Sequence, residues 1–132
     1  MKRLIPIIIF LSSLSGEGAI PFSIDVRPRL IDDSKVLVNV EVTNNVNRPV
    51  DYLEGFLSEY SGKGDLLTEH RMVLVYSYEP PLQNGFSTIK TMQFTVSSEQ
   101  PHTYKFNISK IKFLGESRVF AWHSKSGFIR ID

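Results

Sequence analysis

The sequence predicts an all-β fold, an immunoglobulin-like antiparallel β-sandwich of seven or eight strands, with a small β-barrel as the alternative. Three observations support this prediction. Apolar residues recur at every second position through much of the chain, which is the period of a half-buried strand. Turn-forming residues recur roughly every ten to fifteen residues. No stretch carries a convincing helical period, and strand-favouring residues dominate the apolar runs.

The N-terminal segment, residues 1–18, is predicted to be a secretory signal peptide. Lys2 and Arg3 form a positive start, and the run Leu4–Leu14 carries no charge. This run is shorter than the ~20 residues that a membrane-spanning helix needs, but it suits the apolar region of a signal peptide. Small residues follow, so cleavage is expected after Ser15 or Gly18. The alternative is a buried N-terminal strand in a cytosolic protein.

Composition narrows the class of protein and its compartment. The 132 residues include 15 Lys+Arg and 14 Asp+Glu, and removal of the predicted leader leaves 13 of each. A neutral chain lacks the basic excess that drives binding to nucleic acid. The absence of Cys excludes disulfides, thiolate zinc sites and a cysteine nucleophile. Because exported eukaryotic domains of this size often carry disulfides, we expect a bacterial protein that is periplasmic or secreted.

Residues 19–132 are expected to form one domain, and their first half contains four expected strands. Ile20–Leu30 is the first of them. In Lys35–Thr43 every second residue is valine, which predicts one buried face. Asn44–Pro49 is rich in turn formers, and its Asn side chains are expected to hydrogen-bond the backbone. Val50–Tyr60 alternates again, and Leu66–Tyr76 alternates less cleanly after a loop with two glycines.

The second half continues the pattern with shorter strands. Thr91–Val96 alternates well after the Asn-Gly turn signal at residues 84 and 85. Within 104–113 the apolar positions change phase, which predicts a β-bulge near Ser109. Val119–Trp122 and Phe128–Ile131 are expected to be the last strands.

A strand followed by an Asn-rich turn occupies Val38–Asn45, a second strand follows at Val50–Tyr60, and a glycine-containing turn follows at Tyr60–Leu67. In this order the segments resemble the FxLYD family of bacterial immunoglobulin-like domains. The chain departs from the family pattern at Glu59, where an aromatic residue is usual, and at Ser61, where an acid is usual. The resemblance implies a sandwich fold and an exported accessory or binding module. It implies no catalytic residue.

The sequence does not bring catalytic or metal-binding groups together. His70, His102 and His123 are far apart and are interpreted as surface or turn histidines, with a zinc site built from separate strands as the alternative. Neither Gly-x-Ser segment continues into a nucleophile motif, and the adjacent Asp32 and Asp33 fall in a turn. We therefore expect no cofactor, no metal and no enzyme activity, with a small hydrolase as a remaining alternative.

The residues predicted to bind a partner are Tyr76, Tyr78, Pro80 and Pro81. The tyrosines are expected on one side of a strand end, beside a stiff proline pair. Tyrosine is a good interface anchor because it is large and has few rotamers to lose. The alternative is that the tyrosines cover the core rim and pair across strands.

The resulting prediction is an exported, non-catalytic binding or accessory module of the bacterial envelope. We expect a protein partner or, as the second choice, a glycan, because tyrosine rings also stack on sugars. The module is expected to act through an aromatic loop or a strand edge. The structural alternative is a subunit of an envelope assembly joined by β-augmentation. No membrane span is expected once the leader is removed.

Export should remove the leader. N-terminal sequencing of the mature protein is expected to begin near Gly16 or Ala19, because these positions follow the small residues of the cleavage region. Recovery of chains that start at Met1 from the soluble cytosolic fraction would contradict the prediction.

Overall fold

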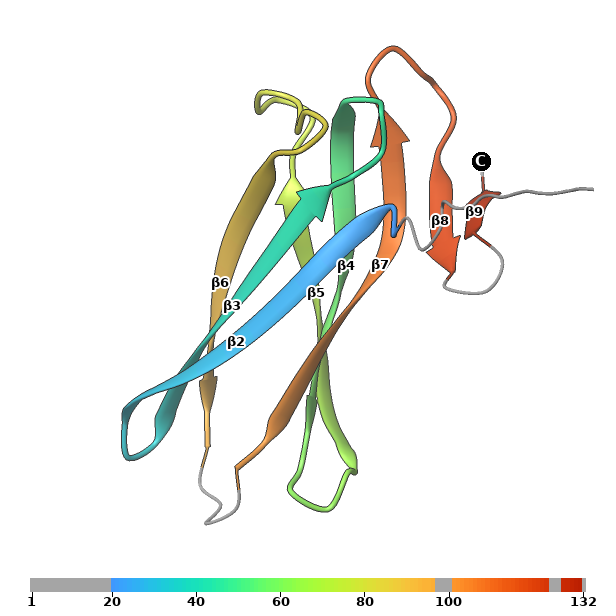
Figure 1. Cartoon of the computed structure of the whole chain (residues 1–132). Helices are drawn as coiled ribbons and strands as arrows, with labels where there is room; N and C mark the ends of the chain where they lie inside the picture. The colour runs from blue at the N-terminus through green and yellow to red at the C-terminus, as the bar shows by residue number, and fades with distance from the viewer. Residues whose placement is uncertain (1–19, 97–100, 124–126, 132) are drawn as a thin grey trace, which may run out of the picture.

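The structure is a computed structural model, which describes residues 20–96, 101–123 and 127–131. The predicted signal peptide lies outside the described residues, as does most of the loop after Val96. Across the described part of the chain there is no helix that could cross a membrane. The strands (Figure 1) are β2 (Phe22–Asp32), β3 (Lys35–Asn44), β4 (Val50–Tyr60), β5 (Leu66–Val75), β6 (Ser87–Thr95), β7 (Thr103–Phe113), β8 (Phe120–His123) and β9 (Gly127–Arg130).

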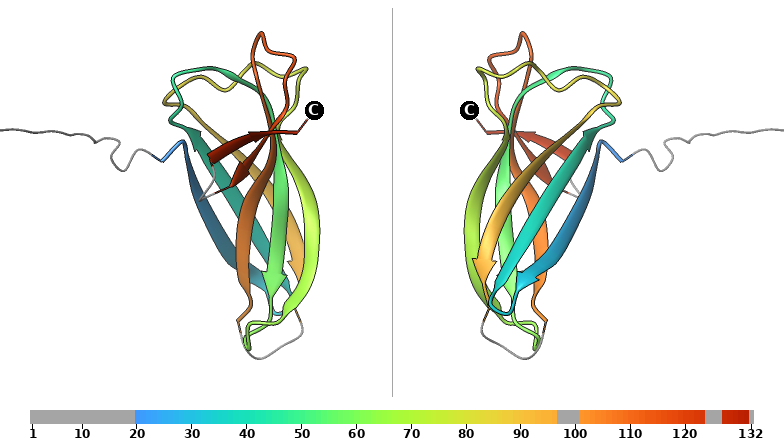
Figure 2. Two further views of the ribbon diagram at one scale, coloured as in Figure 1. Left: turned by 90° about the vertical axis from the view of Figure 1, so that its right-hand side faces the viewer. Right: turned by 90° about the vertical axis from the view of Figure 1, so that its left-hand side faces the viewer.

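Two antiparallel sheets face each other (Figures 1 and 2). One has the order β2-β3-β6 and the other the order β5-β4-β7-β8-β9. Hairpins join β2 to β3, β4 to β5, and β8 to both β7 and β9, whereas the chain changes sheet between β3 and β4, between β5 and β6, and between β6 and β7. This arrangement confirms the predicted sandwich. The sheets do not close on one another, so the barrel alternative is wrong.

The valine row of β3 forms the middle of the core. Val38, Val40 and Val42 are fully buried, as the period-two pattern predicted. β3 pairs with β2 on one side and β6 on the other, so its inward face has neighbours in both directions. Apolar residues of the other sheet, including Leu53 and Leu57, complete the same buried cluster.

A β-bulge in β7 lets two apolar stretches share the core. In the β4–β7 register Glu54 lies opposite Lys110 and Gly55 lies opposite Ile108, so Ser109 is the extra residue. The predicted bulge is therefore confirmed. Close packing accompanies it, because a Cβ on Gly55 would lie 2.3 Å from the Asn107 carbonyl oxygen. Glycine is required at this position by space rather than by backbone angle.

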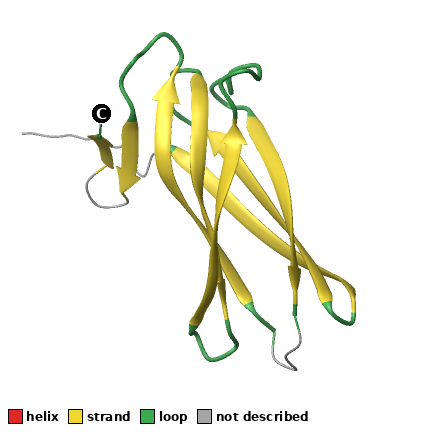
Figure 3. Cartoon of the chain, turned by 180° about the vertical axis from the view of Figure 1, so that it is seen from behind, coloured by secondary structure: helices red, strands yellow, loops and turns green. Residues whose placement is uncertain are grey.

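The loops gather at two ends of the sandwich (Figures 1 and 3). The upper end in Figure 1 carries the loops Asn44–Pro49, Tyr76–Phe86 and Leu114–Val119. Backbone hydrogen bonds tie these loops together, from Asn44 N to Phe86 O at 2.9 Å and from Leu114 N to Pro49 O at 3.0 Å. The lower end carries the β2–β3 and β4–β5 turns.

The core prediction can be tested at Phe106, which is buried in the main cluster. Phe106→Ala is expected to lower the free energy of unfolding by about 3–5 kcal/mol, because it removes packed surface and leaves a cavity. Denaturant unfolding measures the change. The matched control is Phe86→Ala on an exposed ring, which should change stability by less than about 0.5 kcal/mol. Equal effects of the two substitutions would contradict the core assignment.

Candidate functional site

The predicted binding residues lie in the loop after β5, at the upper end. β5 ends at Val75, earlier than the sequence suggested, and Tyr76–Glu79 form a turn in which Glu79 N donates to Tyr76 O at 2.9 Å. The expectation that strand alternation aligns the two tyrosines is therefore wrong. The turn aligns them instead, with ring centroids 5.0 Å apart and an interplanar angle of 22°.

Glu79 holds this turn through both carboxylate oxygens. Tyr76 N donates to Oε1 at 2.8 Å, and Lys90 Nζ donates to Oε2 at 3.3 Å. The same Nζ lies 5.7 Å from the centroid of the Tyr76 ring. The hydrogen bond from Tyr76 N, with help from Lys90 and against the effect of burial, holds the pKa of Glu79 below its ordinary value. One carboxylate thus fixes the backbone of Tyr76 and the lysine beside its ring.

The two rings are presented to solvent. Tyr78 is 82% exposed and Tyr76 is 36% exposed, so neither belongs to the buried core. Phe86, at the far end of the same loop, is 64% exposed. Three exposed aromatic rings thus belong to one loop, and exposed aromatic side chains are candidates for contact with another molecule.

A groove of about 430 Å³ lies between the end of β5 and the start of β6. Pro80 and Pro81 form part of its wall, and Phe86 lies on it as well. The other lining residues are Leu74, Val75, Glu79, Leu82, Gln83, Ser87 and Thr88. The structure therefore brings both predicted prolines to a concave surface in the same loop as the stacked tyrosines.

Asn44 fixes the wall of this groove. Its buried side chain donates from Nδ2 to Leu82 O at 2.9 Å and accepts from Val46 N at 2.8 Å. Its backbone N–H donates to Phe86 O at 2.9 Å, and its carbonyl accepts from Gly85 N. Gly85 has a φ of 84°, which glycine adopts without steric cost. The expectation that an Asn of this turn satisfies the backbone is confirmed, and its partners include the binding loop.

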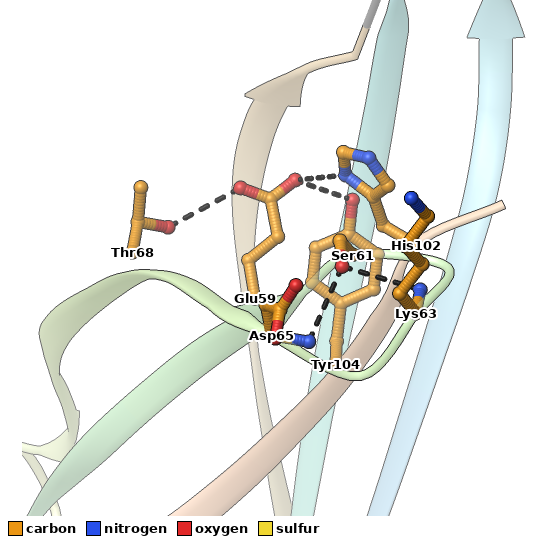
Figure 4. Close-up of polar contacts among 7 residues, drawn as sticks. All are labelled: Glu59, Ser61, Lys63, Asp65, Thr68, His102 and Tyr104. Carbon is orange, nitrogen blue, oxygen red and sulfur yellow. Dashed lines mark hydrogen bonds and ion pairs between the residues drawn. The ribbon is translucent and has the colours of Figure 1, made fainter. Parts of the chain in front are cut away.

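A second polar cluster lies at the lower end and was missed by the sequence analysis (Figure 4). Glu59 is 5% exposed, and its Oε2 lies 2.8 Å from His102 Nδ1 and accepts from the Tyr104 hydroxyl at 3.1 Å. Thr68 donates to Oε1 at 3.2 Å. Of the two predicted settings, surface or turn, the surface is wrong for His102, whose side chain is 9% exposed in the loop just before β7. The strand alternation could have indicated this cluster, because Glu59 lies two residues after Leu57 in β4 and so shares its inward face.

The Glu59 cluster closes the lower end of the core. The Tyr104 ring packs against Phe94, with centroids 5.0 Å apart, and burial together with Glu59 raises the pKa of Tyr104. Ser61 lies in the neighbouring turn, where its Oγ accepts hydrogen bonds from Lys63 N and Asp65 N, both at 3.2 Å. The buried carboxylate is used in holding its neighbours, which favours a structural role.

A third cluster lies on the outer face of β4 and β5. Buried Glu54 accepts from the Tyr52 hydroxyl and from Arg71 Nη2, the latter at 3.1 Å. Burial alone would raise the pKa of Glu54, but the hydrogen bonds from Arg71 and Tyr52 hold it below its ordinary value. A shallow groove of about 490 Å³ adjoins the cluster, with Lys110 and Lys112 on its wall.

Metal ligands do not gather among the described residues, where no group of three His, Asp, Glu or Cys side chains is found. The His70 ring instead contacts Phe94, with centroids 5.6 Å apart. Comparison with models of known protein families, with curated proteins and with solved structures finds no match to this chain. The resemblance to FxLYD domains stays a prediction.

Acid should loosen the tyrosine turn. The pKa of Glu79 is lower in the folded chain than its ordinary value of 4.5. The ionised carboxylate therefore contributes its full stabilisation of the folded state above pH 4.5, and this stabilisation is lost as the pH falls through the lower folded pKa. The Tyr76 amide proton shift, measured by NMR, is expected to titrate with a midpoint below 4.5. Glu79→Gln, which keeps a hydrogen-bonding side chain without the charge, should abolish that titration. A titration that survives in Glu79→Gln would assign it to another group.

Proposed function

We propose that this chain is an exported, non-catalytic binding module of the bacterial envelope that holds a protein partner at its upper end. The proposed contact is the tyrosine–proline surface, defined as Tyr76, Tyr78, Pro80, Pro81 and Phe86. The observation that carries the proposal is the exposed, stacked tyrosine pair in the loop that forms the groove wall.

The tyrosine–proline surface is ordered before any partner arrives. Stacking and the Glu79 hydrogen bonds restrict the two tyrosines, and proline rings restrict the backbone that follows. A surface that loses little conformational freedom on binding converts more of its contact area into affinity. Aromatic rings with few rotamers are the side chains that most often dominate such contacts.

A protein partner fits this surface better than a glycan. Sugar recognition requires polar side chains with free hydrogen-bonding capacity beside the stacking ring. Here Glu79 is engaged by Tyr76 N and Lys90, and Thr88 donates to Leu74 O at 3.3 Å. The Ser87 hydroxyl shares a hydrogen bond of 2.6 Å with that of Thr43. Apart from Gln83, the other side chains that line the groove are apolar, which suits side chains of a polypeptide.

Catalysis is not part of the proposed function, because the buried acids are engaged by other side chains of the fold. The two carboxylates that are buried in the described part of the chain, Glu54 and Glu59, are hydrogen-bonded to neighbouring side chains of the fold. A general acid or base must lie within hydrogen-bond distance of a substrate proton. A nucleophilic side chain must lie within hydrogen-bond distance of the base that activates it. Export is supported by the predicted leader and by the cysteine-free composition.

A displayed library of random peptides tests the proposal. Peptides selected on the purified chain are expected to lose binding by about tenfold or more on Tyr78→Ala, because a hot-spot aromatic contributes at least ~1.4 kcal/mol. Phe86→Ala should act in the same direction. Both residues are exposed, so the variants should keep the parent unfolding midpoint.

The matched control is Leu66→Ala, an exposed apolar residue at the start of β5 at the lower end, outside both proposed binding surfaces. It should leave peptide binding unchanged. Selection of peptides that bind all three variants equally would place the interface elsewhere. A chain that binds members of a glycan array through Tyr78 and selects no peptide would replace the protein partner with a sugar.

A further inference from the structure

One strand of the sandwich keeps an apolar face that the opposite sheet does not cover. Ile24 lies directly opposite Val42 in the β2–β3 register, and Leu30 lies opposite Val36. Directly opposed residues of an antiparallel pair share a face, so both side chains point to the core side of their sheet. The valines are buried, yet Ile24 is 37% exposed and Leu30 is 64% exposed.

Cover over β2 is most complete at its first residue, and Val26 in the middle of the strand is only partly buried against the core. Phe22, the first residue of β2, is buried, and its ring meets that of Phe128 of β9 with centroids 6.2 Å apart. Phe128 in turn meets Phe120 of β8 at 6.4 Å. β8 and β9 therefore cover the start of β2. Figure 1 shows both strands beside only the upper part of the sandwich.

β8 is only 4 residues long, and it therefore leaves part of one edge of β7 without a neighbouring strand. β7 runs over Thr103–Phe113 and pairs with β4 along nearly its whole length. On its other side the register with β8 contains one pair, Ile111 with Phe120. Within the described chain, 103–110 has no strand partner on that side. A strand added there would continue the line of β8 and lie on the side of the inward row of β2, which consists of Ile24, Val26, Pro28 and Leu30.

The charges on β7 indicate the chemistry of such a strand. The outward row of β7 carries Lys105 and Lys110, both exposed, with the exposed Asn107 between them. Lys105 Nζ lies over the Tyr60 ring at 5.4 Å. Lys110 lies opposite Glu54, whose carboxylate is hydrogen-bonded to Arg71, and the lysine charge helps to lower the pKa of that carboxyl. An acidic side chain at an outward position of the added strand would lie next to these lysines, and opposite charges on neighbouring strands stabilise pairing.

We propose that 103–110 of β7 and the inward row of β2 form an acceptor site for an extended segment of a partner protein. The segment pairs with the free edge of β7 through its backbone, places apolar side chains over Ile24 and the rest of that row, and places acidic side chains beside Lys105 and Lys110. This site is separate from the tyrosine–proline surface.

A second copy of the chain fits this site poorly. Pairing β7 with β7 of another copy would set one lysine row beside another, and like charges on neighbouring strands destabilise pairing. Lysines on a free edge also discourage unspecific pairing between copies. A partner strand with acidic residues satisfies the same lysines that repel a copy.

A synthetic peptide of about eight residues, in which valine alternates with glutamate, tests the proposal. Added to the purified chain, it is expected to slow amide hydrogen exchange between Thr103 and Asn107, measured by NMR, and to bind more weakly as salt is raised. A peptide of the same composition with the valines and glutamates in two blocks is the matched control. A peptide in which valine alternates with lysine tests the charge requirement. The block peptide and the valine–lysine peptide should each bind at least about tenfold more weakly than the valine–glutamate peptide.

Variants separate the acceptor site from other edges and from the tyrosine–proline surface. Lys105→Glu and Ile24→Glu should each weaken the alternating peptide by about tenfold, through like charge and through loss of apolar contact. Ile89→Glu, on the exposed edge strand β6, and Tyr78→Ala should leave it unchanged. The amide spectrum of each variant reports whether it is folded, and Lys105→Glu changes an exposed residue only.

Four results would overturn the proposal. Equal binding of the block peptide would show that pairing in register is not required. Protection at β5 or β6 instead of β7 would place the acceptor edge elsewhere. If no peptide binds, the lysines only prevent unwanted pairing at this edge. If 103–107 is protected by self-association of the chain alone, the occupant is a second copy. Loss of tyrosine-dependent binding alone leaves this site standing, because its readout is at β7.

Discussion

The upper end of the molecule depends on one buried amide. Asn44 is fully buried at the last position of β3, and its side chain hydrogen-bonds Val46 N, Arg48 O and Leu82 O. A buried amide without partners would be costly, whereas one with three partners fixes the segments that supply them. Those segments are the β3–β4 loop and the loop that carries the stacked tyrosines. The shape of the groove therefore follows from a residue that lines none of it.

The core and its polar ends divide the work of stabilisation. The valine row of β3 faces Leu53 and Leu57 of the other sheet and supplies apolar burial in the middle. At the lower end Glu59 closes the core with bonds to three side chains, and on the outer face Glu54 joins β4 to Arg71 of β5. Both acids are compensated, which is the condition under which a buried carboxylate is tolerated.

The same sandwich leaves two kinds of surface uncommitted. One is aromatic and lies on a turn that Glu79 makes rigid. The other is a strand edge beside exposed apolar side chains, left by a β8 that pairs with β7 at one position. A loop surface recognises side chains, while a strand edge recognises backbone and pattern. The two surfaces therefore suit different partners, or different parts of one partner, without competing for the same residues.

The sequence by itself determined the strands and the faces they bury. Alternating valines located β3, the phase change located the bulge at Ser109, and the turn formers located the loops, because these features depend on neighbours in the chain. Tertiary structure decided what meets across the sandwich. Strand alternation wrongly aligned Tyr76 and Tyr78, because a carboxylate bond to the backbone ended the strand and formed a turn. The Glu59–His102 contact joins residues 43 positions apart in the sequence, and Leu30 is exposed although Val36, opposite it in the register, is buried. Such pairings depend on how sheets are stacked and on the length of a strand elsewhere, which local period and composition do not encode.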